Sequence, residues 1–210
     1  MRARLPLMLL WMAGGPALLG AVETPPPVAL PGLSAEALAK LEKDETVVLK
    51  SDAKREGDQA KGGGTVLVMV KQPAEAVWRH LTDFEVYPEY MPRVAETKTY
   101  LRDGNTVGVY FELKILWKRI TYHVLHTLNA ETHTITWQLD PAKKNDIVES
   151  IGQFVLTPHG ENRCILSYNL TVDTGMHVPG FVEDFLLRKD LPNVPKAVKK
   201  QAESGGEYKK

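Results

Sequence analysis

Four polar-tipped side chains stand out as groups that could do chemistry, because each shares the alternating phase of its apolar neighbours: Tyr122, His126, Trp137 and Tyr168. If their strands join one sheet, all four turn toward the same face. Buried hydroxyl, imidazole and indole groups need hydrogen-bond partners. Four of them on one apolar face are typical of a pocket with a few orienting groups. The alternative is that this face is simply a packed core.

Motifs for catalysis, metals or cofactors are missing from the sequence. It has no G-x-S-x-G, H-E-x-x-H or paired C-x-x-C and no Gly-rich phosphate loop. His123 and His126 are three residues apart, which on a strand places them on opposite faces and makes them poor joint metal ligands. Asp140, Asp146 and Glu149 fit solvated loop and edge charges better than an acid/base pair. We therefore predict no catalytic residue, metal site or cofactor.

The elements that must position these side chains have a period of two from Arg93 onward, with short turn-forming links that join antiparallel neighbours. Six strands are predicted: Val94–Leu101, Thr106–Ile115, Arg119–Leu128, Thr132–Leu139, Ile147–Thr157 and Arg163–Asp173.

A strand over Thr65–Lys71 and a helix that begins at Pro73 precede this run. Pro88 and Pro92 forbid one continuous helix through the aromatic stretch that follows. Upstream, the sequence predicts a short helix over Ala35–Lys43, a strand over Thr46–Lys50 and a flexible loop over Ser51–Gly64.

The last predicted element is a helical segment over Pro179–Ala202, which Pro192 and Pro195 should kink or interrupt. It has to lie across the concave face of the sheet to bury Phe181 and Phe185. An antiparallel sheet with helices on one face is an α+β fold.

The N-terminus is typical of a cleaved secretory signal peptide, with Arg2 and Arg4 before the apolar run Leu5–Leu19 and a cut after Ala21. An uncleaved anchor is the alternative. The signal predicts a periplasmic or secreted protein. The one cysteine of the sequence, Cys164, alternates with apolar residues and is expected to be a buried, inert thiol. The expected segments are a signal peptide over 1–21, a Pro-rich spacer and short helix over 22–45, one domain over 46–202 and a polar tail over 203–210.

Length and charge agree with one globular domain. The 210 residues carry 26 basic and 26 acidic side chains, so no basic excess points to nucleic acid. One local exception is the predicted hairpin tip, where Lys114, Lys118 and Arg119 surround Trp117. It is either an ordinary solvated turn or a site of transient membrane contact.

Together these features resemble the START-like (SRPBCC) superfamily, in particular its polyketide cyclase/dehydrase and coenzyme Q-binding protein branch. The resemblance covers Thr46–Ala202 and depends on Val77, Trp78, Leu81, Thr82, Asp83, Phe84, Tyr87, Pro88 and Pro92, with the late strands around Gly152-Gln153-Phe154 and Tyr168. It implies a helix-grip fold, in which a curved sheet holds the C-terminal helix around a deep cavity. Pro192 and Pro195 depart from the family's unbroken helix.

We therefore expect a carrier of a lipid, isoprenoid or quinone-like molecule, and the alternative is a cyclase or aromatase that would use His126, Tyr122 and Tyr168 as acid/base groups. Tyr87, Tyr90 and Met91 are expected to form a movable gate. The oligomeric state is left open. The expected binding residues are Tyr87, Tyr90, Met91, Phe111, Leu113, Tyr122, Val124, His126, Trp137, Phe154, Tyr168, Phe181 and Phe185.

Overall fold

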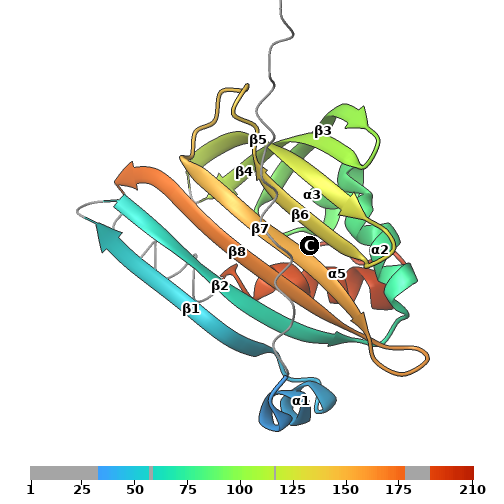
Figure 1. Cartoon of the computed structure of the whole chain (residues 1–210). Helices are drawn as coiled ribbons and strands as arrows, with labels where there is room; N and C mark the ends of the chain where they lie inside the picture. Colours follow the sequence, from blue (N-terminus) through green and yellow to red (C-terminus); the bar gives the residue numbers. More distant parts are fainter. Residues whose placement is uncertain (1–32, 57–58, 116, 178–189) are drawn as a thin grey trace, which may run out of the picture.

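One curved antiparallel sheet organises the protein, as the computed structural model shows in Figure 1. The structure describes residues 33–56, 59–115, 117–177 and 190–210. Its eight strands have the order β1-β2-β8-β7-β6-β5-β4-β3, so the first two strands join the sheet beside the last one.

The strands are long for a globular domain, and together they give the sheet its extended inner face. They are β1 (Val47–Glu56), β2 (Gln59–Val70), β3 (Val94–Asp103), β4 (Thr106–Ile115), β5 (Lys118–Asn129), β6 (Thr134–Leu139), β7 (Glu149–Pro158) and β8 (Cys164–His177). Each of the six strands predicted after Arg93 is found within a few residues of its expected bounds, which confirms the period-two interpretation.

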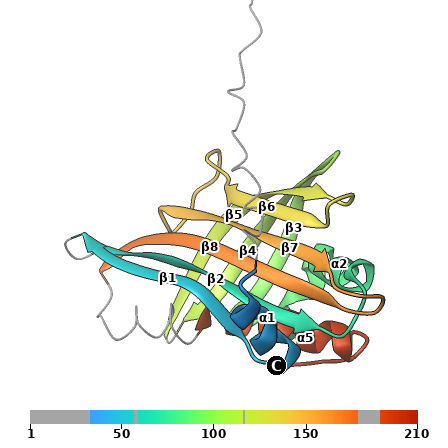
Figure 2. The ribbon, with the colours of Figure 1, turned by 60° about the horizontal axis from the view of Figure 1, so that its bottom comes forward.

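Helices cover both faces of the sheet unequally. The described helices are α1 (Ala35–Glu42), α2 (Ala74–Thr82), the 3₁₀ turn η1 (Phe84–Val86), α3 (Tyr87–Tyr90) and α5 (Asn193–Glu203). In Figures 1 and 2, α2, α3 and α5 gather on the concave side, where they enclose the main core with the sheet. The predicted α+β, helix-grip class is confirmed.

Helix α1 lies on the opposite face, beside β1 and β2 (Figure 2). Ser34 begins the helix, because its hydroxyl accepts a hydrogen bond from the backbone N–H of Ala37 at 3.1 Å. Leu41 of α1 packs with Leu67 and Met69 of β2 in a second, smaller core. Strand β2 is therefore buried on both faces, which explains why Thr65–Lys71 has such a continuous apolar sequence.

The predicted flexible loop over Ser51–Gly64 is wrong. These residues extend β1 and β2 into a long hairpin, in which Glu56 pairs with Gln59. Backbone pairing outweighs the polar composition there, because β2 is held on its other side by β8. The glycines make this contact close: a Cβ atom at Gly63 would lie 2.2 Å from the carbonyl oxygen of Leu170.

The C-terminal helix is described from Asn193, directly after Pro192. Pro195 does not interrupt it, because it lies in the first turn, where its missing N–H has no partner to lose. The first part of the predicted helix, with Phe181 and Phe185, lies outside the described residues. No helix in the described part of the chain is both long and apolar enough to cross a membrane. The proposed segment boundaries stay predictions.

The close approach at Gly63 gives a test of the hairpin. Gly63→Ala should lower the free energy of unfolding by roughly 1–3 kcal/mol, because the added methyl meets a backbone oxygen that cannot move freely. Chemical denaturation measures the change, with Val48→Ala as the control, since Val48 lies in the same hairpin and is 47% exposed. If Gly63→Ala is as stable as the unchanged protein, the close pairing of β2 with β8 at this position is contradicted.

Candidate functional site

A cavity of about 230 Å³ lies between the inner face of the sheet and the helices of the concave side. Its wall is mostly apolar, and ten of the thirteen residues predicted to bind a ligand line it: Tyr87, Met91, Phe111, Leu113, Tyr122, Val124, His126, Trp137, Phe154 and Tyr168. Tyr90 is fully buried and is not part of the lining. Phe181 and Phe185 lie outside the described residues.

Cross-strand register places the aromatic rings of the wall next to one another. Phe111 of β4 pairs with Tyr122 of β5, and their rings stack with centroids 5.5 Å apart. Phe154 of β7 pairs with Tyr168 of β8 in the same way, at 4.9 Å. Since neighbouring strands are antiparallel and in register, the period-two pattern is enough to bring these rings onto one surface.

Trp137 lies flat across β7 because the residue opposite it is a glycine. It pairs with Gly152, where a Cβ atom would lie only 2.3 Å from the indole ring. The indole N–H donates to the hydroxyl of Ser150 at 3.3 Å, which satisfies its one polar atom. Gly152 therefore gives the indole the room that it takes against the sheet.

His126 is a buried base in an aromatic setting. Its ring centroid is 4.4 Å from that of Phe84, and its Nδ1 has no hydrogen-bond partner. Burial lowers the pKa of this imidazole to about 3, and the nearby carbonyl of Val107 offsets only a part of that effect. His126 is consequently neutral at pH 7 and cannot supply a positive charge to the cavity.

The hydroxyls of Tyr122 and Tyr168 complete the polar set of the cavity wall. Neither hydroxyl has a hydrogen-bond partner among the described residues, although both rings line the cavity. Burial raises the pKa of both phenols, so each keeps its proton and stays a potential donor. The inner wall thus offers neutral hydrogen-bonding groups on an apolar background.

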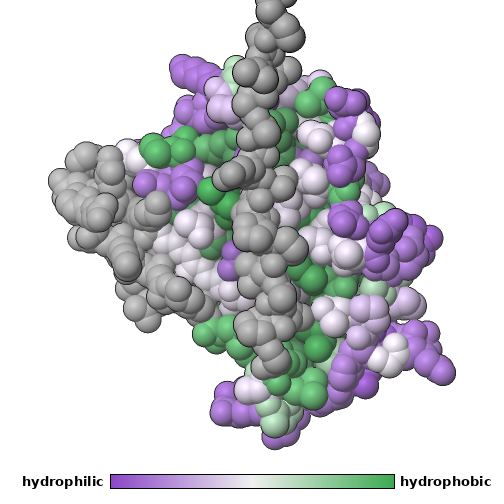
Figure 3. Space-filling view, viewed as in Figure 1, coloured by the Kyte–Doolittle hydropathy of each residue, from purple (hydrophilic) through white to green (hydrophobic). Residues whose placement is uncertain are grey.

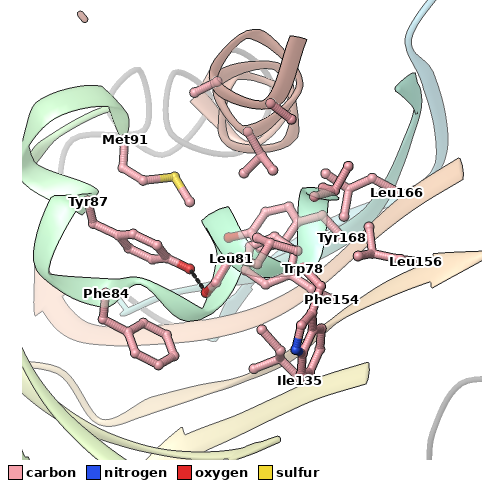
Figure 4. Close-up of a cluster of buried hydrophobic side chains, with 14 of the residues drawn as sticks. Trp78, Leu81, Phe84, Tyr87, Met91, Ile135, Phe154, Leu156, Leu166 and Tyr168 are labelled. Atoms are coloured by element: carbon pink, nitrogen blue, oxygen red, sulfur yellow. Dashed lines mark hydrogen bonds between the residues drawn. The ribbon is translucent and has the colours of Figure 1, made fainter. Parts of the chain in front are cut away.

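The end of α2 holds Tyr87 and Tyr90 by hydrogen bonds. The Tyr87 hydroxyl donates to the carbonyl of Leu81 at 2.6 Å (Figure 4). The Tyr90 hydroxyl donates to the carbonyl of His80 at 3.1 Å. Both acceptors are among the last carbonyls of the helix, which have no partner inside it. These hydrogen bonds hold both rings against α2, and the gate expected of Tyr87, Tyr90 and Met91 stays a prediction.

One end of the cavity is lined by an ion pair that the sequence analysis did not identify. Arg93, which has a positive φ of 64°, directs its Nε to the carboxylate of Asp190 at 3.0 Å. Because 97 positions separate the two residues, no local pattern could have indicated the contact.

Other chemistry is limited in the part of the chain that the structure covers. It contains no group of three or more His, Cys, Asp or Glu side chains that could hold a metal ion. Cys164 is buried, and burial raises the pKa of its thiol to about 12, in agreement with the expected inert thiol.

Comparisons with known proteins point to one family. A family model described as polyketide cyclase / dehydrase and lipid transport matches residues 70–199. No curated protein matches the chain.

Solved structures that resemble it include an aromatase/cyclase from Streptomyces sp. R1128, with a TM-score of 0.60 and 16% identity over 68% of this chain and 94% of that one. A STAR-related lipid transfer protein from Xanthomonas axonopodis has a TM-score of 0.60 and 15% identity over 73% and 98% of the two chains. A START superfamily protein from Mycobacterium smegmatis has a TM-score of 0.58 and 21% identity over 68% and 97%. At these identities the likeness establishes the fold alone.

The buried imidazole predicts a specific pH dependence. The unfolded chain binds a proton at His126 below pH 6.5, whereas the folded protein does so only near pH 3, so this residue destabilises the fold as pH falls through that window. The loss should be about 1.4 kcal/mol of unfolding free energy for each pH unit. His126→Leu removes the effect. In denaturation experiments, the free energy of unfolding of the variant should therefore rise relative to that of the unchanged protein as the pH is lowered from 6.5 to 4. Parallel curves for the two proteins would contradict the assignment.

Proposed function

Since this chain belongs to the family of polyketide cyclases, dehydrases and lipid transport proteins, we propose that it binds and carries a hydrophobic small molecule in the cavity between the sheet and the C-terminal helical region. The observation that carries the proposal is the cavity itself. Contact with its aromatic and aliphatic wall would contribute roughly 25 cal/mol of binding free energy for each Å² of apolar ligand surface removed from water.

The character of the wall narrows the ligand class. His126 is neutral, and the hydroxyls of Tyr122 and Tyr168 keep their protons. Arg93 also lines the cavity, but its charge is paired with that of Asp190, so the lining has little net charge to offset that of a buried anion. A carbonyl or hydroxyl oxygen, in contrast, could accept a hydrogen bond from either phenol. We infer a neutral ligand with an apolar body and at least one oxygen, as in an isoprenoid or quinone-like molecule.

The size of the cavity also bears on the ligand. A volume of about 230 Å³ is below the roughly 300–1,000 Å³ of common ligand pockets. This supports a compact guest, or insertion of one end of a longer molecule, over complete enclosure of a lipid with two acyl chains.

A cyclase or aromatase is the second candidate function. The observation in its favour is that His126, Tyr122 and Tyr168 all line one cavity, where they could exchange protons with a polyketide-like substrate. Against it, His126 has a pKa of about 3, far from the value that suits a base at neutral pH. Mass spectrometry of the bound molecule after incubation separates the two functions, because a carrier returns its ligand unchanged.

We also propose that the carrier works outside the cytoplasm. The support is the sequence of the N-terminus, in which Arg2 and Arg4 precede the Leu-rich run 5–19. The intact mass of protein isolated from its own host would then correspond to a chain that begins near Val22. Recovery of a cytoplasmic chain that keeps Met1 would contradict this.

Narrowing the cavity should weaken binding while the fold is kept. Val124 is 2% exposed and its side chain lines the cavity, so Val124→Trp fills space that a ligand needs. We expect the affinity for a fluorescent quinone analogue to fall at least tenfold, a loss of about 1.4 kcal/mol or more. Titration of the probe measures this loss, with thermal unfolding followed in parallel.

The matched control is Leu125→Trp, which adds an indole on the opposite face of β5, where Leu125 is only partly buried. It should bind the probe like the unchanged protein. If the unchanged protein never binds the probe and Val124→Trp melts early, these residues form only a core and the carrier proposal fails.

A further inference from the structure

The two most exposed large apolar side chains of the described residues are Trp117, with 80% of its surface exposed, and Val148, with 67%. The next in order are Val48 at 47%, Leu49 at 46% and Leu101 at 39%. Exposing an indole to water forgoes the free energy of burial that its large apolar surface would otherwise provide. Trp117 and Val148 therefore have the most apolar surface to gain from contact with a partner.

Both side chains are close in sequence to residues of the cavity wall. Trp117 follows Ile115 by two positions and Val148 directly follows Ile147, and both isoleucines line the cavity. The backbone N–H of Val148 donates to the carbonyl of Asp173 at 2.9 Å, which places it beside the end of β8. Because the sheet is antiparallel, β4 and β8 finish at the same end of the sheet at which β5 and β7 start.

The views of the molecule agree with this placement. Apolar side chains reach the surface at the upper left of Figure 3, where Figure 1 places the end of β8 and the start of β7. Strongly polar side chains lie beside them at the upper left and also gather at the right-hand edge, where α2 lies.

The charged residues next to Trp117 in sequence are all basic. The described residues of 114–119 include the exposed Lys114, Lys118 and Arg119 and no acidic residue. Arg119 forms an ion pair with Glu112, whose side chain is only 12% exposed, and the carboxylate of Asp146 is held by hydrogen bonds to β5. Lys114 and Lys118 therefore present positive charge to solvent next to the exposed indole.

We propose that Trp117 and Val148, with Lys114 and Lys118, dock the cavity opening on an anionic lipid surface. Indole rings favour the interface between headgroups and acyl chains, and basic side chains are attracted to anionic lipids. Docking there lets an apolar ligand pass between bilayer and cavity without crossing water. Because this surface lies outside the cavity, the proposal goes beyond ligand carriage and is tested separately from it.

Sedimentation with vesicles tests the proposal on the full chain. The protein should sediment with vesicles of phosphatidylcholine and phosphatidylglycerol, and much less with phosphatidylcholine alone. Added salt should release it, because salt screens exposed charges. Trp117→Ser and Lys118→Glu should each weaken binding to the anionic vesicles by roughly tenfold.

Leu101→Ser is the matched control, since it removes an exposed apolar side chain from β3, away from the opening, and should leave vesicle binding unchanged. Probe binding in solution should be the same in all variants, which distinguishes a failure of docking from a failure of the cavity. Thermal unfolding verifies the fold of each variant. Failure of the unchanged protein to bind anionic vesicles, or equal binding by Trp117→Ser, overturns the proposal.

Discussion

The hydrogen bonds at the end of α2 are the constraint on which the concave side of the molecule depends. The last turn of the helix lies at the margin of the core, and a buried carbonyl such as that of Leu81 costs about 1–3 kcal/mol when it has no partner. Tyr87 and Tyr90 satisfy two of these carbonyls, and they can do so only because the chain turns back at η1 and α3. That turn brings Phe84 and Met91 to the cavity, and the hydroxyl of Thr97 on β3 donates to the carbonyl of Phe84 at 2.7 Å.

Those features that arise from local periodicity could be predicted from the sequence. Phe111 and Tyr122 were expected on one face, and antiparallel register alone places them there. The stretch 51–64 could not be predicted, because its partner is β8 and its composition is that of a loop. Arg93 and Asp190 were missed for the same reason, since nothing near either residue indicates the other. Tyr90 has the aromatic type of a lining residue, but its hydroxyl is used to end a helix.

The polar groups of the cavity wall differ in how they are satisfied. Trp137 has a partner in Ser150, so its indole is fixed whether or not a guest is present. His126, Tyr122 and Tyr168 leave hydrogen-bonding capacity unused, which a purely structural core would avoid. The wall therefore combines a rigid aromatic frame with a small number of groups available to a guest, the arrangement that gives orientation as well as affinity.

The position of β2 beside β8 has a consequence for how the protein folds. Val66 pairs with Tyr168, 102 positions later, so the hairpin of β1 and β2 has no sheet to join until nearly the whole domain has been synthesised. Loop closure over that distance is entropically costly, and pairings of this kind slow folding. The meander from β3 to β8 can form from contacts between sequence neighbours, so we expect the seam between β2 and β8 to close last. Tyr168 and the other strand residues of the cavity wall belong to that meander, so the wall can form before the hairpin of β1 and β2 docks and closes the core beside it.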